Sequence, residues 1–254
     1  MRFLVLALWL LAPVVHAQTP VLEYHRFAAV AIDSLTVSTK VLDEQLRVLA
    51  ERHTVVQARR LVAHLRGEAP ALPPGSVVLT VDDGHVSVYE EMYPRIRQRG
   101  FHVTLFVYPS AISSAPWALT WAQLRELADS GLFDVQSHTY FHPDFQAQKK
   151  TLASSAYETL VATQLVRSRQ LLASRLEKRI DLLAWPFGQQ DAELMRAADL
   201  AGYAGAFTVG RRAVASGDPV MAIPRIRMTD KHRGSAFTRL LHAASPGTDR
   251  PRTP

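Results

Sequence analysis

The stretch that decides the fold is an apolar run that ends in two acids and a glycine, Val77-Val78-Leu79-Thr80-Val81-Asp82-Asp83-Gly84-His85. Its β-branched residues, bounded upstream by Pro73-Pro74-Gly75, indicate a strand buried in the core of a sheet. A polar turn directly after such a strand lies at the strand's carboxyl end, where α/β folds carry their reactive side chains. We therefore expect reactive side chains of a functional site in the turn that follows this strand.

Segments typical of strands and of helices alternate along the rest of the chain. Strand-like runs lie at 103–107, 133–136, 182–185 and 206–208, and helical patterns at 89–99, 154–176 and 192–201. Ser38 is a suitable N-cap for a helix, and Thr120 with Gln123 has the spacing of a capping box. The alternation predicts a parallel sheet with helical crossovers. For 254 residues, a barrel and an open doubly wound sheet both fit.

The first 17 residues have the layout of a secretory signal peptide. Met1-Arg2 supplies positive charge, residues 3–15 are almost entirely apolar, and Val15-His16-Ala17 ends in the small residue that a signal peptidase reads. The apolar run is shorter than the roughly 20 residues that span a bilayer, so we expect no stable membrane anchor after cleavage. We predict a periplasmic or secreted protein with one domain at 20–241 and a disordered tail at 245–254.

Composition narrows the classes of partner. The formal net charge is +6, but the lysines and arginines are scattered and form no aromatic-rich basic groove, so we expect no nucleic acid partner. The chain has no cysteine, which excludes disulfides and a lipid attached through a cysteine.

Two motifs at predicted strand ends carry residues that bind metals. Asp82 and Asp83 are adjacent and diverge, so one carboxylate can bind an ion while the other faces a water, although an Asx turn also explains the pair. His138 and His142 follow the strand at 133–136 and can meet one ion if the segment makes a helical turn. One carboxylate and two imidazoles leave coordination positions open, as hydrolytic zinc sites require, and the other carboxylate can serve as general base.

Aromatic residues near the predicted strand ends add a third candidate feature. In Trp185-Pro186-Phe187-Gly188, the proline biases the backbone, so that an N–H can be held toward the site to stabilise an oxyanion; a plain hydrophobic turn explains the stretch equally well. Trp117, Trp121 and Trp185 can stack on sugar rings, although Trp121 lies at a helix start and is expected in the core.

These residues resemble the polysaccharide deacetylases, carbohydrate esterase family 4, which share the NodB homology domain. The family's Thr-Phe-Asp-Asp-Gly motif is matched at 80–84 with Val81 in place of phenylalanine, and its His-Ser/Thr-x-x-His-Pro motif is met in full at 138–143. The similarity extends over 21–241. It is to the compact branch that includes deacetylases of the biofilm polymer poly-β-1,6-N-acetylglucosamine.

The resemblance implies a fold and a set of roles. The implied fold is a distorted (β/α) barrel of about seven strands in a single NodB-like domain. Asp83, His138 and His142 would bind one divalent ion, zinc first, with cobalt or nickel as alternatives. Asp82 would deprotonate the metal-bound water, and the backbone amide of Phe187 would share the oxyanion.

The chain departs from the family's pattern at two points. The arginine that usually opens the third motif and braces the catalytic aspartate is replaced by Ala184, and Arg225 or Arg227 is the candidate substitute, against a surface role. The Leu-x-His that supplies the general acid has no clear counterpart, because Leu240-Leu241-His242 follows a predicted helix. His25 is therefore the candidate second catalytic imidazole, unless it only packs beside the metal site.

The leading hypothesis is a metal-dependent hydrolase that removes N-acetyl groups from an N-acetylglucosamine polysaccharide of the cell envelope or biofilm matrix. Poly-β-1,6-N-acetylglucosamine is the first candidate substrate, with Trp185 and Tyr140 as candidate sugar contacts. Peptidoglycan, chitooligosaccharides and acetylxylan stay open within the same chemistry. A non-catalytic glycan-binding relative and an exported nuclease or phosphatase are alternatives of other classes. Polymer-export machinery is the candidate protein partner.

Overall fold

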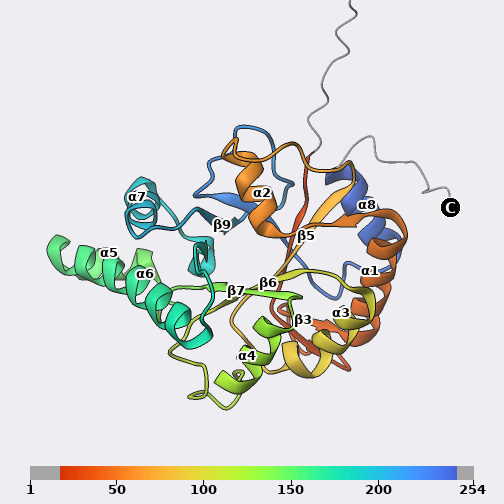
Figure 1. Ribbon diagram of the computed structural model, residues 1–254, viewed down its shortest axis with the longest axis horizontal. Coiled ribbons are helices and arrows are strands. Elements are labelled where there is room, and N and C mark those ends of the chain that lie inside the picture. The colour runs from red at the N-terminus through yellow and green to blue at the C-terminus, as the bar shows by residue number, and fades with distance from the viewer. Residues whose placement is uncertain (1–17, 245–254) are drawn as a thin grey trace, which may run out of the picture.

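The computed structural model describes residues 18–244, in which parallel strands form a closed barrel surrounded by helices (Figure 1). Seven strands pair side by side in the order β1 (Val21–Tyr24), β10 (Ile223–Arg227), β9 (Gly205–Val209), β8 (Leu182–Ala184), β7 (Phe133–Ser137), β6 (Val103–Val107) and β5 (Ser76–Val81). Pairing of β5 with β1 closes the ring. The predicted barrel of about seven strands is therefore confirmed, and the open sheet is excluded. The predicted signal peptide at 1–17 and tail at 245–254 lie outside the described residues.

Helices connect the strands on the outside of the barrel. They are α1 (Thr39–Arg52), α2 (Ala58–Leu65), α3 (Tyr93–Arg99), α4 (Trp121–Asp129), α5 (Phe145–Thr151), α6 (Ser154–Leu176), α7 (Ala192–Leu200) and α8 (Ser235–Ala244). Short elements are β4 (Thr54–Val55), which pairs with the start of β5, the parallel pair β2 (Arg26–Ala28) and β3 (Thr36–Ser38), and the helical turns η1 (Val88–Met92) and η2 (Pro186–Gly188). Within residues 18–244, no helix has the length and apolar character to cross a bilayer.

The helix starts that were predicted from capping residues are observed. Ser38 Oγ accepts the N–H of Val41 at the start of α1, and Thr120 and Gln123 form a reciprocal capping box at α4. The predicted helix at 89–99 ends before Gly100, whose φ of 63° lies in the left-handed region, but its first turn is the π-helical η1. Helices α2 and α5, which have eight and seven residues, were not predicted.

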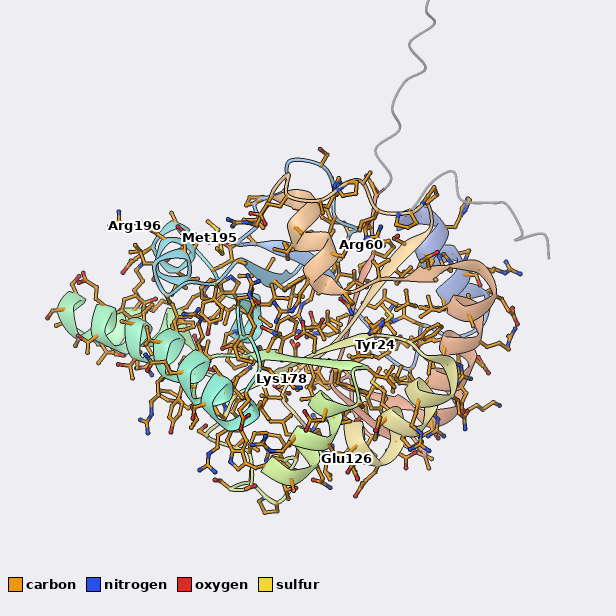
Figure 2. All side chains as sticks on the ribbon, in the orientation of Figure 1. Tyr24, Arg60, Glu126, Lys178, Met195 and Arg196 are labelled. Atoms are coloured by element: carbon orange, nitrogen blue, oxygen red, sulfur yellow. The ribbon has the colours of Figure 1, made fainter. Side chains whose placement is uncertain are left out.

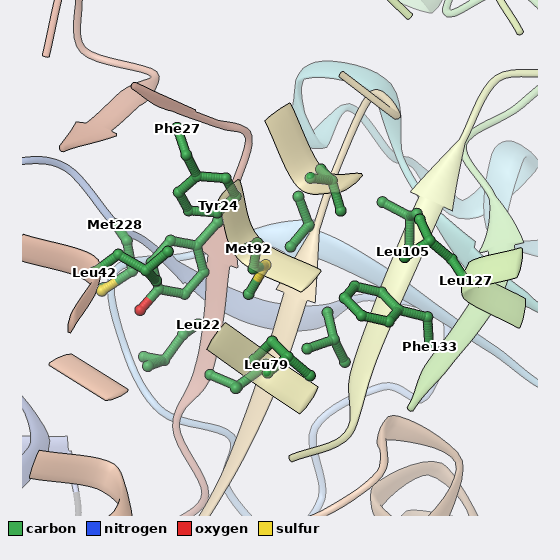
Figure 3. Packing of buried hydrophobic residues seen from close by; sticks show 14 of the residues in the cluster. Leu22, Tyr24, Phe27, Leu42, Leu79, Met92, Leu105, Leu127, Phe133 and Met228 are labelled. Atoms are coloured by element: carbon green, nitrogen blue, oxygen red, sulfur yellow. The ribbon is translucent and has the colours of Figure 1, made fainter. Parts of the chain in front are cut away.

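The pleat of β5 divides the apolar core into two parts. Leu79 and its outward-facing neighbours pack with Leu22, Leu105 and the helices around them, as Figure 3 shows. Val78 faces inward, into a cluster with Phe106 and Phe207. Helix α2 contributes to this inner cluster, and side chains fill the space between the barrel and its helices throughout (Figure 2). Because α2 packs against the start of β9, it closes the amino-terminal end of the barrel and leaves the carboxyl end for the site.

Strands β7 and β8 are joined mainly by a side chain. Their ladder pairs only Ser137 with Leu183. Beneath this pair, Gln136 Oε1 accepts the backbone N–H groups of Asp181 (2.9 Å) and Leu182 (2.8 Å). The Gln136 amide therefore replaces missing ladder bonds and sets the spacing between the two loops that follow these strands.

Candidate metal centre at the carboxyl end of the barrel

The two acids after β5 diverge because the chain turns sharply between them. Asp82 continues the strand direction, and its side chain is buried. Asp83 has a φ of 73°, in the left-handed region, and Gly84 follows with a φ of 78°. A Cβ on Gly84 would lie 2.9 Å from Val107 Cγ1, so only glycine fits this turn without displacing the end of β6.

Asp83, His138 and His142 converge on one point. Asp83 Oδ1 lies 3.6 Å from His138 Nε2 and 3.9 Å from His142 Nε2, and one ligand atom from each residue lies within 4.8 Å of the others. Ligand atoms about 2.1 Å from a tetrahedrally coordinated ion lie about 3.4 Å apart, slightly closer than these separations. His138 Nδ1 bonds the carbonyl oxygen of Ala184 at 2.8 Å, so it carries the proton and Nε2 is free to coordinate. The geometry fits one divalent ion.

The loop that carries the two histidines is not a helical turn, which was the condition stated for their convergence, yet the two imidazoles converge. Thr139 and His142 have φ values of 64° and 58°, which bend the chain back on itself. Gln164, fully buried on α6, accepts the N–H groups of Tyr140 (3.1 Å) and Phe141 (2.9 Å) with one oxygen. A side chain from α6 therefore holds a left-handed bend that brings the imidazoles together.

Arg225 contacts the carboxylate that the missing arginine of the third motif would brace. Its guanidinium donates to both carboxylate oxygens of Asp82, at 2.7 and 2.6 Å, and both side chains are buried. Burial raises the pKa of Asp82, but the charge and hydrogen bonds of Arg225 outweigh it, and the pKa lies below its ordinary value. Arg227, the other candidate, instead donates to Glu23 at 2.9 Å. Of the two alternatives left open by the sequence, Arg225 is the one that contacts Asp82.

His25 lies beside this carboxylate in a buried position. Its Nε2 is 3.7 Å from Glu23 Oε1, while its Nδ1 is buried and lacks a hydrogen-bond partner. Burial lowers the pKa of His25, which favours the neutral ring. Glu23, His25 and Asp82 also lie close enough to share an ion. However, Arg227 and Arg225 already neutralise the two carboxylates, so this set does not fit a cation.

The electrostatics of the converging imidazoles suit metal binding. Burial lowers the pKa of His142 to about 4, with the neighbouring His138 adding to the effect. A neutral imidazole is the form that coordinates a divalent ion.

Three further predicted site residues, Phe187, Trp185 and Tyr140, have different surroundings in the structure. Phe187 has a φ of 56° and is 60% exposed. Its ring packs edge-on against His142 with centroids 4.7 Å apart, so this side chain lies beside the candidate centre. Trp185 is fully buried and donates its indole N–H to the carbonyl of Met221 at 2.9 Å, so the predicted sugar contact by Trp185 is wrong. Tyr140 is half-buried, with the guanidinium of Arg167 over one face of its ring.

A pocket of about 180 Å³ opens beside Asp83 and is also lined by His25, Arg26, His85, Tyr108 and Trp117. Sequence reasoning missed His85 and Tyr108 as site residues. Reactive side chains of α/β folds lie at the carboxyl ends of strands, and this rule located Asp82. It could also have found these two residues, because Tyr108 directly follows β6 and His85 follows the turn after β5. Burial raises the pKa of Tyr108 to about 12, so the phenol is protonated at neutral pH.

A larger hollow of about 690 Å³ lies between α6 and α7. It has none of the titratable groups that line the pocket beside Asp83, and it is mostly apolar.

Comparisons with known proteins agree with this architecture. Residues 69–206 match a family model described as polysaccharide deacetylase. YxkH of Bacillus subtilis (strain 168), whose name assigns it to the polysaccharide deacetylases, is 24% identical over 223 residues, 87% of this chain and 75% of that protein. The poly-β-1,6-N-acetyl-D-glucosamine N-deacetylase of Staphylococcus aureus (strain MRSA252) is 23% identical over 162 residues, 62% of this chain and 56% of that enzyme. The solved structure of IcaB from Ammonifex degensii has a TM-score of 0.75 and 26% identity, and the match covers 89% of this chain and 98% of IcaB.

Proposed function

Because this chain belongs to the polysaccharide deacetylase family, we propose that it hydrolyses the acetamide groups of an N-acetylglucosamine polysaccharide, with poly-β-1,6-N-acetylglucosamine as the first candidate. One observation carries the proposal. Asp83, His138 and His142 converge beside a second buried carboxylate, Asp82, that stays ionised through its pair with Arg225. The similarity to the Staphylococcus aureus enzyme, named for that polymer, supports the choice of substrate.

The three converging side chains would hold one divalent ion, zinc first, with cobalt or nickel as alternatives. When bound, the ion supplies Lewis-acid polarisation of the acetamide carbonyl and lowers the pKa of a water molecule. The donor set of one carboxylate and two neutral imidazoles suits these ions, and leaves coordination positions open for substrate.

Asp82 is the general base of the proposed reaction. Its carboxylate accepts a proton from the attacking water, and Arg225 fixes the orientation of both oxygens during this step. The backbone N–H of Phe187, in a left-handed turn beside His142, is the proposed donor to the developing oxyanion.

The leaving amine must also receive a proton, and two groups can supply it. Asp82 carries a proton after the attack, and His25 lies beside it. The lowered pKa of His25 favours the neutral imidazole, which is a poor acid, so His25 can donate only after it has gained a proton within the complex. The His25→Ala variant described below separates the two routes.

Acetate release from a panel of polymers tests the proposal. We expect release from poly-β-1,6-N-acetylglucosamine, and its loss with a chelator and in Asp82→Asn. Faster release from peptidoglycan, chitooligosaccharides or acetylxylan would reassign the substrate within the same chemistry. Binding of these polymers without release of acetate, at saturating zinc or cobalt, would instead identify a non-catalytic glycan-binding relative.

The proposed reaction places the protein where such polymers occur, in the periplasm or outside the cell. Polymer-export machinery is the proposed partner there. Fractionation of cells that express the full chain tests the location, and retention in the cytoplasm would contradict it.

A further inference from the structure

An exposed tryptophan lies on the rim of the pocket beside the candidate metal centre. Trp117 is 36% exposed and lines the same pocket as Asp83 and His25. The other tryptophans of the described residues are placed differently. Trp185 is fully buried, and Trp121 packs on the outer core with Arg175 over its ring. A large apolar ring that stays exposed next to a site is a candidate ligand contact.

Trp117 ends a continuous row of rings that crosses the centre. Ring centroids are 4.7 Å apart for Phe187 and His142, 5.3 Å for His142 and Tyr108, and 5.9 Å for Tyr108 and Trp117. The two ends of the row, Phe187 and Trp117, are exposed, whereas Tyr108 between them is half-buried. The row therefore has a surface on each side of His142, which suits an extended ligand better than a single small one.

The backbone ties Trp117 to the turn that carries Asp83. The N–H of Val86 donates to the carbonyl of Trp117 at 2.8 Å, and the N–H of Leu119 donates to the carbonyl of Gly84 at 2.9 Å. The position of the indole relative to the centre is therefore set by the fold and not by a free loop.

His85 supports the indole from one side. Its ring stacks on Trp117 with an interplanar angle of 15° and centroids 6.1 Å apart. The N–H of Ser87 donates to His85 Nδ1 at 3.1 Å, which fixes the plane of the imidazole. The indole is thus held in place before any ligand arrives, which lowers the entropic cost of binding.

We propose that Trp117 binds the sugar unit next to the one whose acetamide lies at the metal centre, with His85 as the positioning residue beneath it. This inference rests on the proposed function and extends it to the length of the substrate. A pyranose presents C–H groups on its faces. These apolar groups pack against a flat aromatic ring more favourably than water molecules do. The protein would then act within chains and prefer oligomers to single acetylated groups.

Two substrates of different size test the proposal. The measured quantity is kcat/KM for a β-1,6-linked N-acetylglucosamine tetramer divided by kcat/KM for p-nitrophenyl acetate. We expect Trp117→Ala to lower this ratio about tenfold, the scale of one lost aromatic contact, and Trp117→Phe to keep most of it.

The positioning role of His85 is tested with the same ratio. His85→Ala should lower the ratio through KM for the tetramer, and His85→Phe, which keeps a ring beneath the indole, should restore it. Leu200→Ala removes an exposed apolar side chain on α7 and is the matched control, with the ratio of the unmodified protein. An unaltered ratio in Trp117→Ala overturns the proposal.

A binding measurement keeps the two proposals separate. The tetramer is titrated into Asp82→Asn, and into the same variant that also carries Trp117→Phe, while tryptophan fluorescence is recorded. A ligand-dependent signal that disappears with Trp117 supports this inference even if the unmodified protein releases no acetate, a result that would refute only the proposed reaction. A signal that is the same in both variants overturns the inference.

Discussion

Arg225 on β10 holds both oxygens of Asp82 at the end of β5, at 2.7 and 2.6 Å, across 143 residues of sequence. β1 lies between these two strands in the closed barrel, so barrel closure brings the two side chains together. The guanidinium comes from β10, two strands away from β8, whose last residue Ala184 takes the arginine position of the family's third motif. The ion pair thus keeps Asp82, the proposed general base, ionised through a residue that motif matching does not find.

We expect Arg225→Met to move the acidic limb of the pH–rate profile to higher pH. The change removes the guanidinium, the strongest of the groups that oppose the effect of burial on Asp82. The pKa of the carboxyl therefore rises, so the base becomes protonated, and the rate falls, at a higher pH than before. Breaking a buried ion pair should also destabilise the fold by about 3–5 kcal/mol. The measurements are kcat/KM against pH and thermal unfolding. Arg227→Met is the control on the same strand and should leave the acidic limb in place; a limb that also stays in place in Arg225→Met would contradict this role.

Substitutions of the two adjacent acids should have different effects on turnover and on metal content. Asp82→Asn should lower kcat about 100- to 10,000-fold, the range for loss of a general base, and keep the metal. Asp83→Asn should lower metal content as well, because it removes the only charged group of the three converging ligands. Metal analysis of the purified variants and acetate release are the measurements. Equal metal loss in both variants would show that the roles of the two carboxylates are not distinct.

Gln164→Leu should weaken metal binding without direct contact to the ion. The change leaves the N–H groups of Tyr140 and Phe141 without a partner, at about 1–3 kcal/mol each, and frees the bend between the histidines. The expected results are a smaller rise in melting temperature on addition of zinc, faster hydrogen exchange of these two amides, and an altered visible spectrum with cobalt. Val161→Ala, a buried change one turn away on α6, should lower stability yet keep the cobalt spectrum. The same spectrum in Gln164→Leu would assign Gln164 to packing only.

His25→Ala distinguishes the two routes for the second proton. If His25 passes a proton to the leaving amine, kcat should fall about 100-fold or more while metal content is retained. If Asp82 carries the proton through both steps, turnover should change little. Acetate release at several pH values, together with metal analysis, decides between the two, and metal loss in the variant would place His25 in a structural role instead.

Much of the fold follows from patterns that are local in the sequence. The run at 77–81 predicts a buried strand because its neighbours are apolar and a proline–glycine break precedes it, and β5 lies there. The starts of α1 and α4 were predicted because capping bonds join residues only three positions apart. The resemblance to a family supplied the closed barrel, which the alternation of elements alone did not distinguish from an open sheet.

The sequence by itself determined most strands of the barrel, most helices and the polar residues at strand ends, because these depend on side chains a few positions apart. It could not decide between Arg225 and Arg227, between a helical turn and the left-handed bend at the histidines, or between Trp117 and Trp185 as the exposed ring. Those outcomes depend on which distant segments pack together: β10 beside β1, α6 under the histidine loop, and Met221 against the buried indole. Only the closed barrel brings these partners within bonding distance, so only the tertiary structure decided them.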